Sequence, residues 1–232
     1  MLYDNYKEVQ NNIIKACEKA GRNPDEVTLI AVSKTKPLSD IEELISYGVK
    51  EFGENKPQEM KQKIEEVSTP VNFHLIGHLQ TNKVKYIIDK VCMIHSVDSL
   101  KLAEEISRQA VKHNVTVDIL IEVNVAAEES KFGVRPEDAI DLCRDISTLP
   151  GIRIRGLMTV APFTSDPEEN RPVFCALRQL FVDIDGKNID NVCMDCLSMG
   201  MSGDYTVAIE EGATFVRVGT SIFGQRDYGV ER

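Results

Sequence analysis

The sequence contains no tryptophan, and its aromatic content is only 6%. It has no apolar run near the roughly 18 residues of a membrane-spanning helix, and its first residues, MLYDNYKEVQ, lack the basic and apolar regions of a signal peptide. Acidic residues outnumber basic ones by 37 to 27, and Lys and Arg form no cluster that could neutralise nucleic-acid phosphates. These absences argue against a membrane protein, a secreted protein and a nucleic-acid-binding protein.

Cysteine, histidine and glycine motifs are also missing. The six cysteines show no disulfide framework, and Cys193 and Cys196 would point to opposite faces of a strand. The four histidines lack the helical spacing of a zinc protease, and there is no P-loop or G-x-S-x-G elbow. We therefore expect a cytoplasmic protein with reduced thiols and no metal site.

The chain does contain a regular alternation of short runs rich in valine and isoleucine with longer segments of helical period. An additional amphipathic helix, Tyr3–Ala20, precedes the first run and should end at Gly21. The strand candidates are Val27–Ser33, Glu51–Glu54, Val71–Ile76, Val91–Val97, Val115–Val125, Ile152–Val160, Asn191–Met199 and Thr214–Ile222. The helix candidates between them are Leu38–Tyr47, Lys56–Glu66, Asn82–Asp89, Ser99–His113, Pro136–Thr148, Glu168–Ile184 and Tyr205–Glu211.

Apolar strands separated by helices are typical of a parallel sheet that is covered on both faces. About eight strand–helix units are enough to close a (β/α)₈ barrel. The alternative is a doubly wound open sheet, which usually has a glycine-rich loop after its first strand, whereas the first run here leads into Ser33–Pro37, without glycine. We predict an α/β protein with a single TIM-barrel domain over residues 1–232 and an extra N-terminal helix.

Several strand candidates end in polar residues, and in such a barrel these ends form the active face. Lys34 follows the first strand, where desolvation would favour the neutral amine that Schiff-base chemistry needs. Taken alone, Lys34 is better interpreted as a lysine reaching into solvent. Lys36 is expected to be an exposed loop lysine.

Two small, hydroxyl-rich turns follow the seventh and eighth strands. One contains Ser198, Gly200 and Ser202, and the other is 219–221, with sequence GTS. Turns of this kind expose backbone N–H groups that accept phosphate, and barrels often bind phosphate at this place. Each turn alone is equally well explained as ordinary loop chemistry. Both turns together, opposite Lys34, indicate a phosphorylated cofactor.

Arg217 stands inside the apolar run 215–218, where a charge needs a partner or a ligand. Directed at a pyridine nitrogen, it would keep that nitrogen unprotonated, because guanidinium does not release its proton. A structural ion pair is an equal alternative. Among the histidines, His78 could line the mouth, whereas His74 and His95 are expected to be packed.

Six motifs occur in order along the chain: AVSKTKP at 31–37, FGEN at 52–55, HLIGHLQTNK at 74–83, GLMT at 156–159, LSMGMS at 197–202 and VRVGT at 216–220. Together they resemble the pyridoxal phosphate homeostasis protein family, whose barrel is like the N-terminal domain of alanine racemase. The resemblance implies pyridoxal 5′-phosphate (PLP) as the cofactor, held as a Schiff base on Lys34, with Arg217 facing the pyridine nitrogen.

The resemblance also implies the remaining cofactor contacts. It assigns Ser198, Met201, Ser202, Gly219 and Thr220 to the phosphate and Asn55 and Met158 to the ring. One departure is Gly203, where many relatives carry an acidic or amide residue, and this glycine could loosen the phosphate loop.

Members of this family are thought to buffer or deliver PLP, without well-established turnover. The alternative is a PLP-dependent amino-acid racemase, which needs a second acid/base on the opposite face of the substrate. In alanine racemase that group is a tyrosine, in a protein with an extra β-domain, which we expect this chain to lack. None of the six tyrosines is an obvious substitute. We therefore predict a monomeric, non-enzymatic PLP carrier, with cofactor-free PLP enzymes as candidate recipients.

Overall fold

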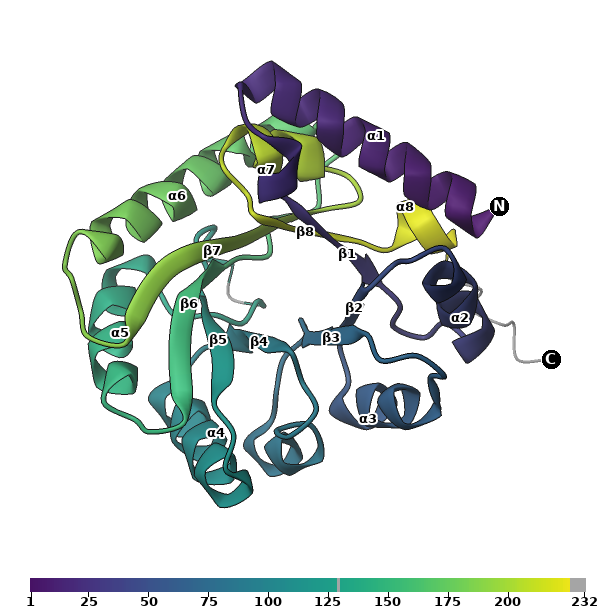
Figure 1. The fold of residues 1–232 in the computed structure, drawn as a ribbon. Helices are drawn as coiled ribbons and strands as arrows, with labels where there is room; N and C mark the ends of the chain where they lie inside the picture. Colours follow the sequence, from purple (N-terminus) through teal and green to yellow (C-terminus); the bar gives the residue numbers. More distant parts are fainter. Residues whose placement is uncertain (129, 226–232) are drawn as a thin grey trace.

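The computed structural model describes residues 1–128 and 130–225. Eight parallel strands form one closed barrel in sequence order, with β8 paired to β1 (Figure 1). This confirms the predicted TIM barrel. The strands are β1 (Thr28–Val32), β2 (Glu51–Glu54), β3 (Asn72–Leu75), β4 (Met93–Val97), β5 (Val117–Glu122), β6 (Ile152–Met158), β7 (Val192–Met201) and β8 (Phe215–Val218).

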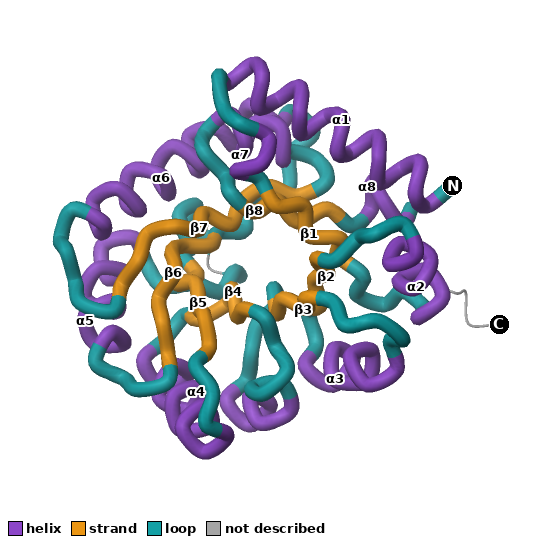
Figure 2. Tube along the Cα trace, viewed as in Figure 1, coloured by secondary structure: helices purple, strands orange, loops and turns teal. Residues whose placement is uncertain are grey.

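Helices surround the barrel on its outside (Figure 2). The α-helices are α1 (Leu2–Ala20), α2 (Leu38–Ser46), α3 (Pro57–Glu66), α4 (Leu100–His113), α5 (Ala139–Ser147), α6 (Arg171–Asp185), α7 (Tyr205–Glu210) and α8 (Thr220–Phe223). Short 3₁₀ helices are η1 (Pro24–Glu26), η2 (Thr81–Tyr86), η3 (Pro136–Asp138) and η4 (Pro167–Asn170). Among the described residues, no helix has both the length and the apolar character needed to cross a bilayer.

The predicted element boundaries differ from the structure mainly near the ends of elements. The last run was predicted to continue to Ile222, but β8 stops at Val218 because the chain turns at Gly219 and Thr220–Phe223 forms α8. The segment predicted as a helix over Asn82–Asp89 forms the 3₁₀ helix η2 instead. The first difference lies at the C-terminal rim, and the second lies in the helix layer, where η2 packs against α3 and α4.

The interior of the barrel differs from the layer between strands and helices. The outer layer holds one large apolar core, whereas the interior contains only a small apolar cluster. Along β8, Val216 and Val218 belong to the outer core, so Phe215 and Arg217 face the barrel axis. The interior cluster consists of Met93, Leu120, Met158 and Cys196, with Val160 and Phe215 packed against it.

The predicted N-terminal helix is confirmed as α1, which packs against α7 and α8 on the outside of the barrel (Figure 1). It ends at Gly21, which adopts a left-handed conformation with φ of 66° and donates its N–H to the last turn of the helix. Its buried face consists of Tyr6, Val9, Ile13, Ala16 and Cys17.

Two adjacent isoleucines in α1 test this packing. Ile13 is 5% exposed and Ile14 is 41% exposed. Ile13→Ala is expected to lower the free energy of unfolding by about 2–4 kcal/mol because it leaves a cavity, whereas Ile14→Ala should change it by less than about 1 kcal/mol. Urea unfolding of both variants measures the difference. Equal losses would show that α1 is not packed in this way.

Candidate functional site

The strand β1 ends in a tight turn that carries Lys34 at the C-terminal rim. The turn is closed by the Lys36 N–H, which donates to the Ser33 carbonyl at 3.0 Å. Thr35 has a φ of 63°, a left-handed conformation that is costly for a β-branched residue and must be imposed by its surroundings. Lys34 is half-buried. The turn thus holds this lysine at the boundary between the barrel mouth and solvent.

A buried ion cluster lies behind the lysine turn, between β1, β2 and α3. The Lys63 ammonium donates to the Ser33 carbonyl and to the carboxylates of Glu54 and Glu59, each at 2.7 Å. The Ser33 hydroxyl donates to Glu54 at 2.6 Å, and the Thr35 N–H donates to Glu59 at 2.6 Å. Burial raises the pKa of Glu54, against the opposing effects of Lys63 and Ser33. The cluster therefore holds the residues on both sides of Lys34.

The neighbours of β1 bring further predicted residues close to the lysine turn. The parallel register with β2, continued beyond the strands, sets Asn55 beside Lys34. The register with β8 sets Gly219 beside Val32, at the start of the turn. The Lys36 ammonium also donates to the Phe223 carbonyl at 2.9 Å, which ties the lysine turn to α8. The lysine turn and the last turn of the barrel therefore lie side by side.

The two predicted phosphate turns meet at the Ser202 hydroxyl. Its oxygen accepts the Gly219 N–H at 3.2 Å and the Ser221 N–H at 3.4 Å. These N–H groups converge on one point, as a phosphate oxygen would require. The Met201 N–H instead donates to the Asp204 carboxylate at 2.6 Å. The structure thus brings Ser202 and Gly219 together, while the Met201 N–H holds its own loop.

The end of β7 and the loop after it are fixed by the packing at Gly200 and by the contacts of Asp204, whereas Gly203 has open space around it. Gly200 has a φ of 90°, and a Cβ there would lie 2.6 Å from the Ala208 Cβ and 2.9 Å from the Tyr205 Cα. At Gly203, no described atom lies within 4 Å of such a Cβ. Asp204 anchors the loop because it also accepts from Asn170 at 2.8 Å. The loosening expected from Gly203 is therefore opposed by the Asp204 contacts.

Arg217 lies in the barrel interior with 4% of its surface exposed. Its two terminal nitrogens donate to the Ser198 hydroxyl at 2.6 Å and to the Thr159 carbonyl at 2.7 Å. Burial lowers the pKa of Arg217 to about 10, although Glu122 and Asp204 oppose this shift. The guanidinium therefore remains protonated at neutral pH.

Two of the predicted cofactor contacts are completely buried. The Ser198 hydroxyl lies in the interior, bonded to Arg217 and to His95, instead of at the Ser202 hydroxyl where the two turns meet. Met158 pairs with Ser198 in the sheet and belongs to the interior apolar cluster. Both therefore lie below the rim that carries Lys34. Thr220 is exposed at the start of α8.

Glu122, at the end of β5, is a buried charge that the sequence interpretation missed. It is 6% exposed, and its Oε2 has no hydrogen-bond partner among the described residues. Burial and the nearby Asp98 raise its pKa to about 7, against the opposing effect of Arg217. The signal was present, because Glu122 interrupts an apolar run as Arg217 does. Glu54 and Lys63 were missed for a different reason, since their pairing requires α3 to pack beneath β1 and β2.

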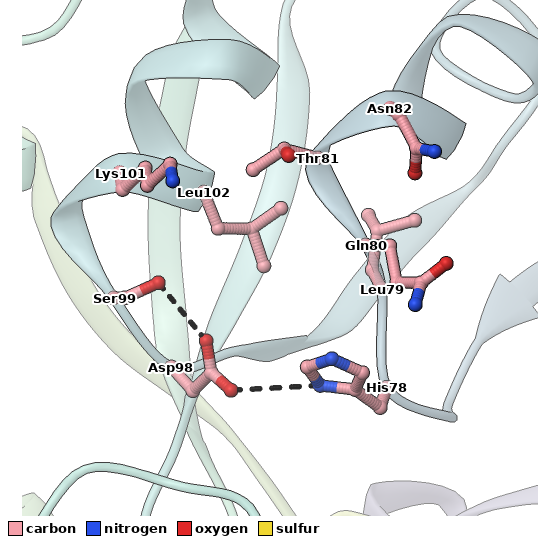
Figure 3. Close-up of a pocket in the computed structure, with 9 residues that line it drawn as sticks. All are labelled: His78, Leu79, Gln80, Thr81, Asn82, Asp98, Ser99, Lys101 and Leu102. Carbon is pink, nitrogen blue, oxygen red and sulfur yellow. Dashed lines mark hydrogen bonds and ion pairs between the residues drawn. The ribbon is translucent and has the colours of Figure 1, made fainter.

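A shallow cavity of about 370 Å³ lies beside the mouth, between η2 and the start of α4 (Figure 3). His78 and Asp98 are the lining residues at one end, with His78 Nδ1 3.6 Å from the Asp98 carboxylate. The His78 ring stacks on Phe132 with ring centres 3.7 Å apart. The remaining lining residues are Leu79, Gln80, Thr81, Asn82, Ser99, Lys101 and Leu102. His78 therefore lines this cavity and is partly exposed.

Comparison with known proteins identifies the class first. A family model described as the alanine racemase N-terminal domain matches residues 5–227. An alanine racemase from Clostridium difficile shares the fold with a TM-score of 0.75 at 14% identity, over 97% of this chain and 58% of that one. The family model covers nearly the whole chain. The protein therefore belongs to the alanine-racemase-like class of barrels.

Curated relatives define the family within this class. A pyridoxal phosphate homeostasis protein from Aquifex aeolicus is 47% identical, covering 95% of this chain and 96% of its own length. Another from Pseudomonas aeruginosa is 41% identical, covering 98% of this chain and 97% of its own length. A structure of PipY from Synechococcus elongatus with PLP bound has a TM-score of 0.80 at 33% identity, over 91% of this chain and 100% of that one. The chain belongs to the pyridoxal phosphate homeostasis protein family.

The buried carboxyl of Glu122 predicts a specific pH dependence of stability. Its pKa rises from 4.5 to about 7 in the folded protein. The folded state therefore binds the proton more tightly, and the free energy of unfolding should fall as the pH rises from about 4.5 to 7. Glu122→Gln removes this effect. We compare the free energy of unfolding of Glu122→Gln with that of wild type. The difference, variant minus wild type, should rise by about 2–3 kcal/mol between pH 5 and pH 8.

Urea unfolding at the two pH values measures this change, with the exposed Glu104→Gln as a control. A difference that stays constant with pH would mean that Glu122 is ionised at its ordinary pKa.

Proposed function

We propose that this protein binds PLP covalently through Lys34 at the C-terminal rim of the barrel and holds it for buffering or delivery. The observation that carries the proposal is the adjacency of the lysine turn to the Gly219–Thr220 turn, with protonated Arg217 on the barrel axis. The PLP-bound structure of PipY and the names of the curated relatives support it.

The residues present fit a phosphorylated aromatic aldehyde. When bound, PLP supplies an aldehyde that condenses with a lysine amine, with loss of water. Ser202 occupies the point where two backbone N–H groups converge, and these groups with Thr220 would hold the phosphate. Arg217 would donate to the ring nitrogen and keep it unprotonated, which weakens the ring as an electron sink. Asn55 would lie along the ring edge.

The ion cluster of Lys63 makes the lysine turn a rigid holder. Ser33 and Thr35 are both bonded to this cluster, so the backbone on each side of Lys34 is fixed before a ligand arrives. A preorganised turn lowers the entropic cost of binding. The same rigidity suits a protein that holds its cofactor firmly.

Covalent attachment predicts a site-specific label. Treating the PLP-loaded protein with borohydride should fix one pyridoxyl phosphate group on Lys34, as shown by peptide mass mapping. Lys34→Ala should abolish both the label and the visible absorbance band, because no amine remains at this place. Lys36→Ala, which loses the bond to Phe223, should keep the label. A label on Lys36 in wild type would refute the assignment.

The carrier function is favoured over a racemase by the positions of the tyrosines. Tyr3, Tyr6, Tyr86 and Tyr205 lie on α1, η2 and α7, and Tyr47 directly follows α2, all of them outside the barrel. Tyr228 lies outside the described residues. Glu122 is the observation that favours the second candidate, because a buried acid with a pKa near 7 could act as an acid/base group.

Cofactor transfer separates the two functions. Cofactor-free PLP enzymes mixed with the loaded protein should regain activity as the visible band of the carrier falls, and free PLP at equal concentration gives the reference rate. The purified protein should not racemise free amino acids. Turnover that disappears in Glu122→Gln would establish the racemase instead.

A further inference from the structure

A continuous chain of polar contacts runs through the barrel interior to Arg217. Glu51 Oε2 lies 2.8 Å from His74 Nε2, and His74 Nδ1 lies 3.0 Å from His95 Nε2. His95 Nδ1 lies 3.0 Å from the Ser198 hydroxyl, which accepts from Arg217 at 2.6 Å. We call these five residues the axial chain. Each successive pair joins two different strands: β2 to β3, β3 to β4, β4 to β7 and β7 to β8.

The axial chain passes from one end of the barrel towards the other. Glu51 is the first residue of β2, and its side chain is 26% exposed, whereas His74 is 2% exposed and His95 and Ser198 are completely buried. Phe215 packs against both imidazole rings, with ring centres 5.6 and 5.5 Å away. The rings are therefore shielded from water and held in position.

With His74 taken as a neutral ring, the contacts allow one consistent assignment of the protons. A carboxylate only accepts, so His74 must donate through Nε2, which leaves Nδ1 of a neutral ring as an acceptor. His95 must then donate through Nε2 and accept at Nδ1, so the Ser198 hydroxyl donates to His95. The oxygen of Ser198 thus remains free to accept from Arg217. Every donor in the axial chain points from Arg217 towards Glu51.

The electrostatics agree with this assignment. Burial opposes ionisation of Glu51, but the hydrogen bonds from His74 and Asn72 lower its pKa below the ordinary value. Burial, His74 and Arg217 together lower the pKa of His95 well below its usual range. Glu51 is therefore an ionised acceptor, and His95 is a neutral ring.

We propose that Glu51, His74, His95 and Ser198 are positioning residues that orient the Arg217 guanidinium as a donor towards the ring nitrogen of the bound cofactor. The inference rests on the proposed function. It gives the polar axis of the barrel a role and moves Ser198 from the phosphate to the ring-nitrogen side of the site. Glu51 thereby influences the cofactor from the opposite end of the barrel.

The proton assignment can be tested on the cofactor-free protein. Long-range ¹H–¹⁵N spectra distinguish the tautomers of histidine, and single substitutions of His78 and His113 identify the other two rings. His95 should be neutral with its proton on Nε2, and His74 should carry its shared proton on Nε2, facing Glu51. A proton on Nδ1 of His95, or a charged His95, would overturn the axial chain as described.

The role of Ser198 can be tested with two ligands. Ser198→Ala should weaken the binding of PLP and of pyridoxal, which lacks the phosphate, by the same factor of about tenfold or more, since a hydrogen bond to a charged group is lost. Ser107→Ala, which removes another buried hydroxyl bonded to the Pro150 carbonyl, should change neither affinity. Loss of PLP affinity alone would return Ser198 to the phosphate and overturn the proposal, as would no change for either ligand.

The bound cofactor also reports on the axial chain spectroscopically. Glu51→Gln keeps an acceptor for His74 but removes the charge at the far end, and it should shift the pH at which the visible band of bound PLP titrates. An unchanged profile would show that Glu51 is structural only. If the wild-type protein binds neither PLP nor pyridoxal, the proposed function is wrong. The tautomer spectra of the cofactor-free protein are independent of that result, and they decide whether the axial chain exists.

Discussion

The buried guanidinium of Arg217 is the group on which the barrel interior depends. A permanent charge can be buried only if its donors are satisfied. Ser198 and Thr159 satisfy two of them and so tie β8 to β7 and to the end of β6. The Ser198 hydroxyl also lies 3.0 Å from His95 Nδ1, which extends the polar contacts to β4. The polar axis therefore follows from one arginine in an otherwise apolar strand.

A second buried cation organises the outer layer in a similar way. Lys63 binds a strand-end carbonyl and two carboxylates, so it links α3 to the ends of β1 and β2. Lys63 lies on α3 and donates to the Ser33 carbonyl. The lysine turn is therefore held from the helix layer and not from the barrel interior. The site thus has two supports, one on each side of the sheet, and Lys34 lies between them. Replacing Lys63 would therefore disturb the lysine turn although Lys63 itself is bonded to Ser33, Glu54 and Glu59.

The fold could be predicted from the sequence because the strands are short apolar runs and the helices have a clear 3.6-residue hydrophobic period. The residues at the rim could be predicted from the strand ends, since Asn55 and Ser202 directly follow strands and Lys34 is the second residue after β1. The orientation of the Ser198 side chain could not be predicted from the sequence. The inward and outward alternation of side chains along β7 is interrupted by register shifts against β6 and β8. The contacts of Lys63 also required the packing of α3, and no local pattern specifies which carbonyl a helix lysine reaches.

The contacts around Arg217 and the lysine turn suit a site that holds its cofactor more than one that catalyses a reaction with it. Catalysis on the ring needs an electron sink and a mobile acid/base pair, whereas in the proposed site the ring-nitrogen partner would be Arg217, a protonated arginine held by Ser198 and Thr159. The lysine turn is held by a buried ion cluster that leaves its backbone little freedom. Glu122 is the exception, because its Oε2 has no hydrogen-bond partner among the described residues and its pKa of about 7 lets it exchange a proton near neutral pH.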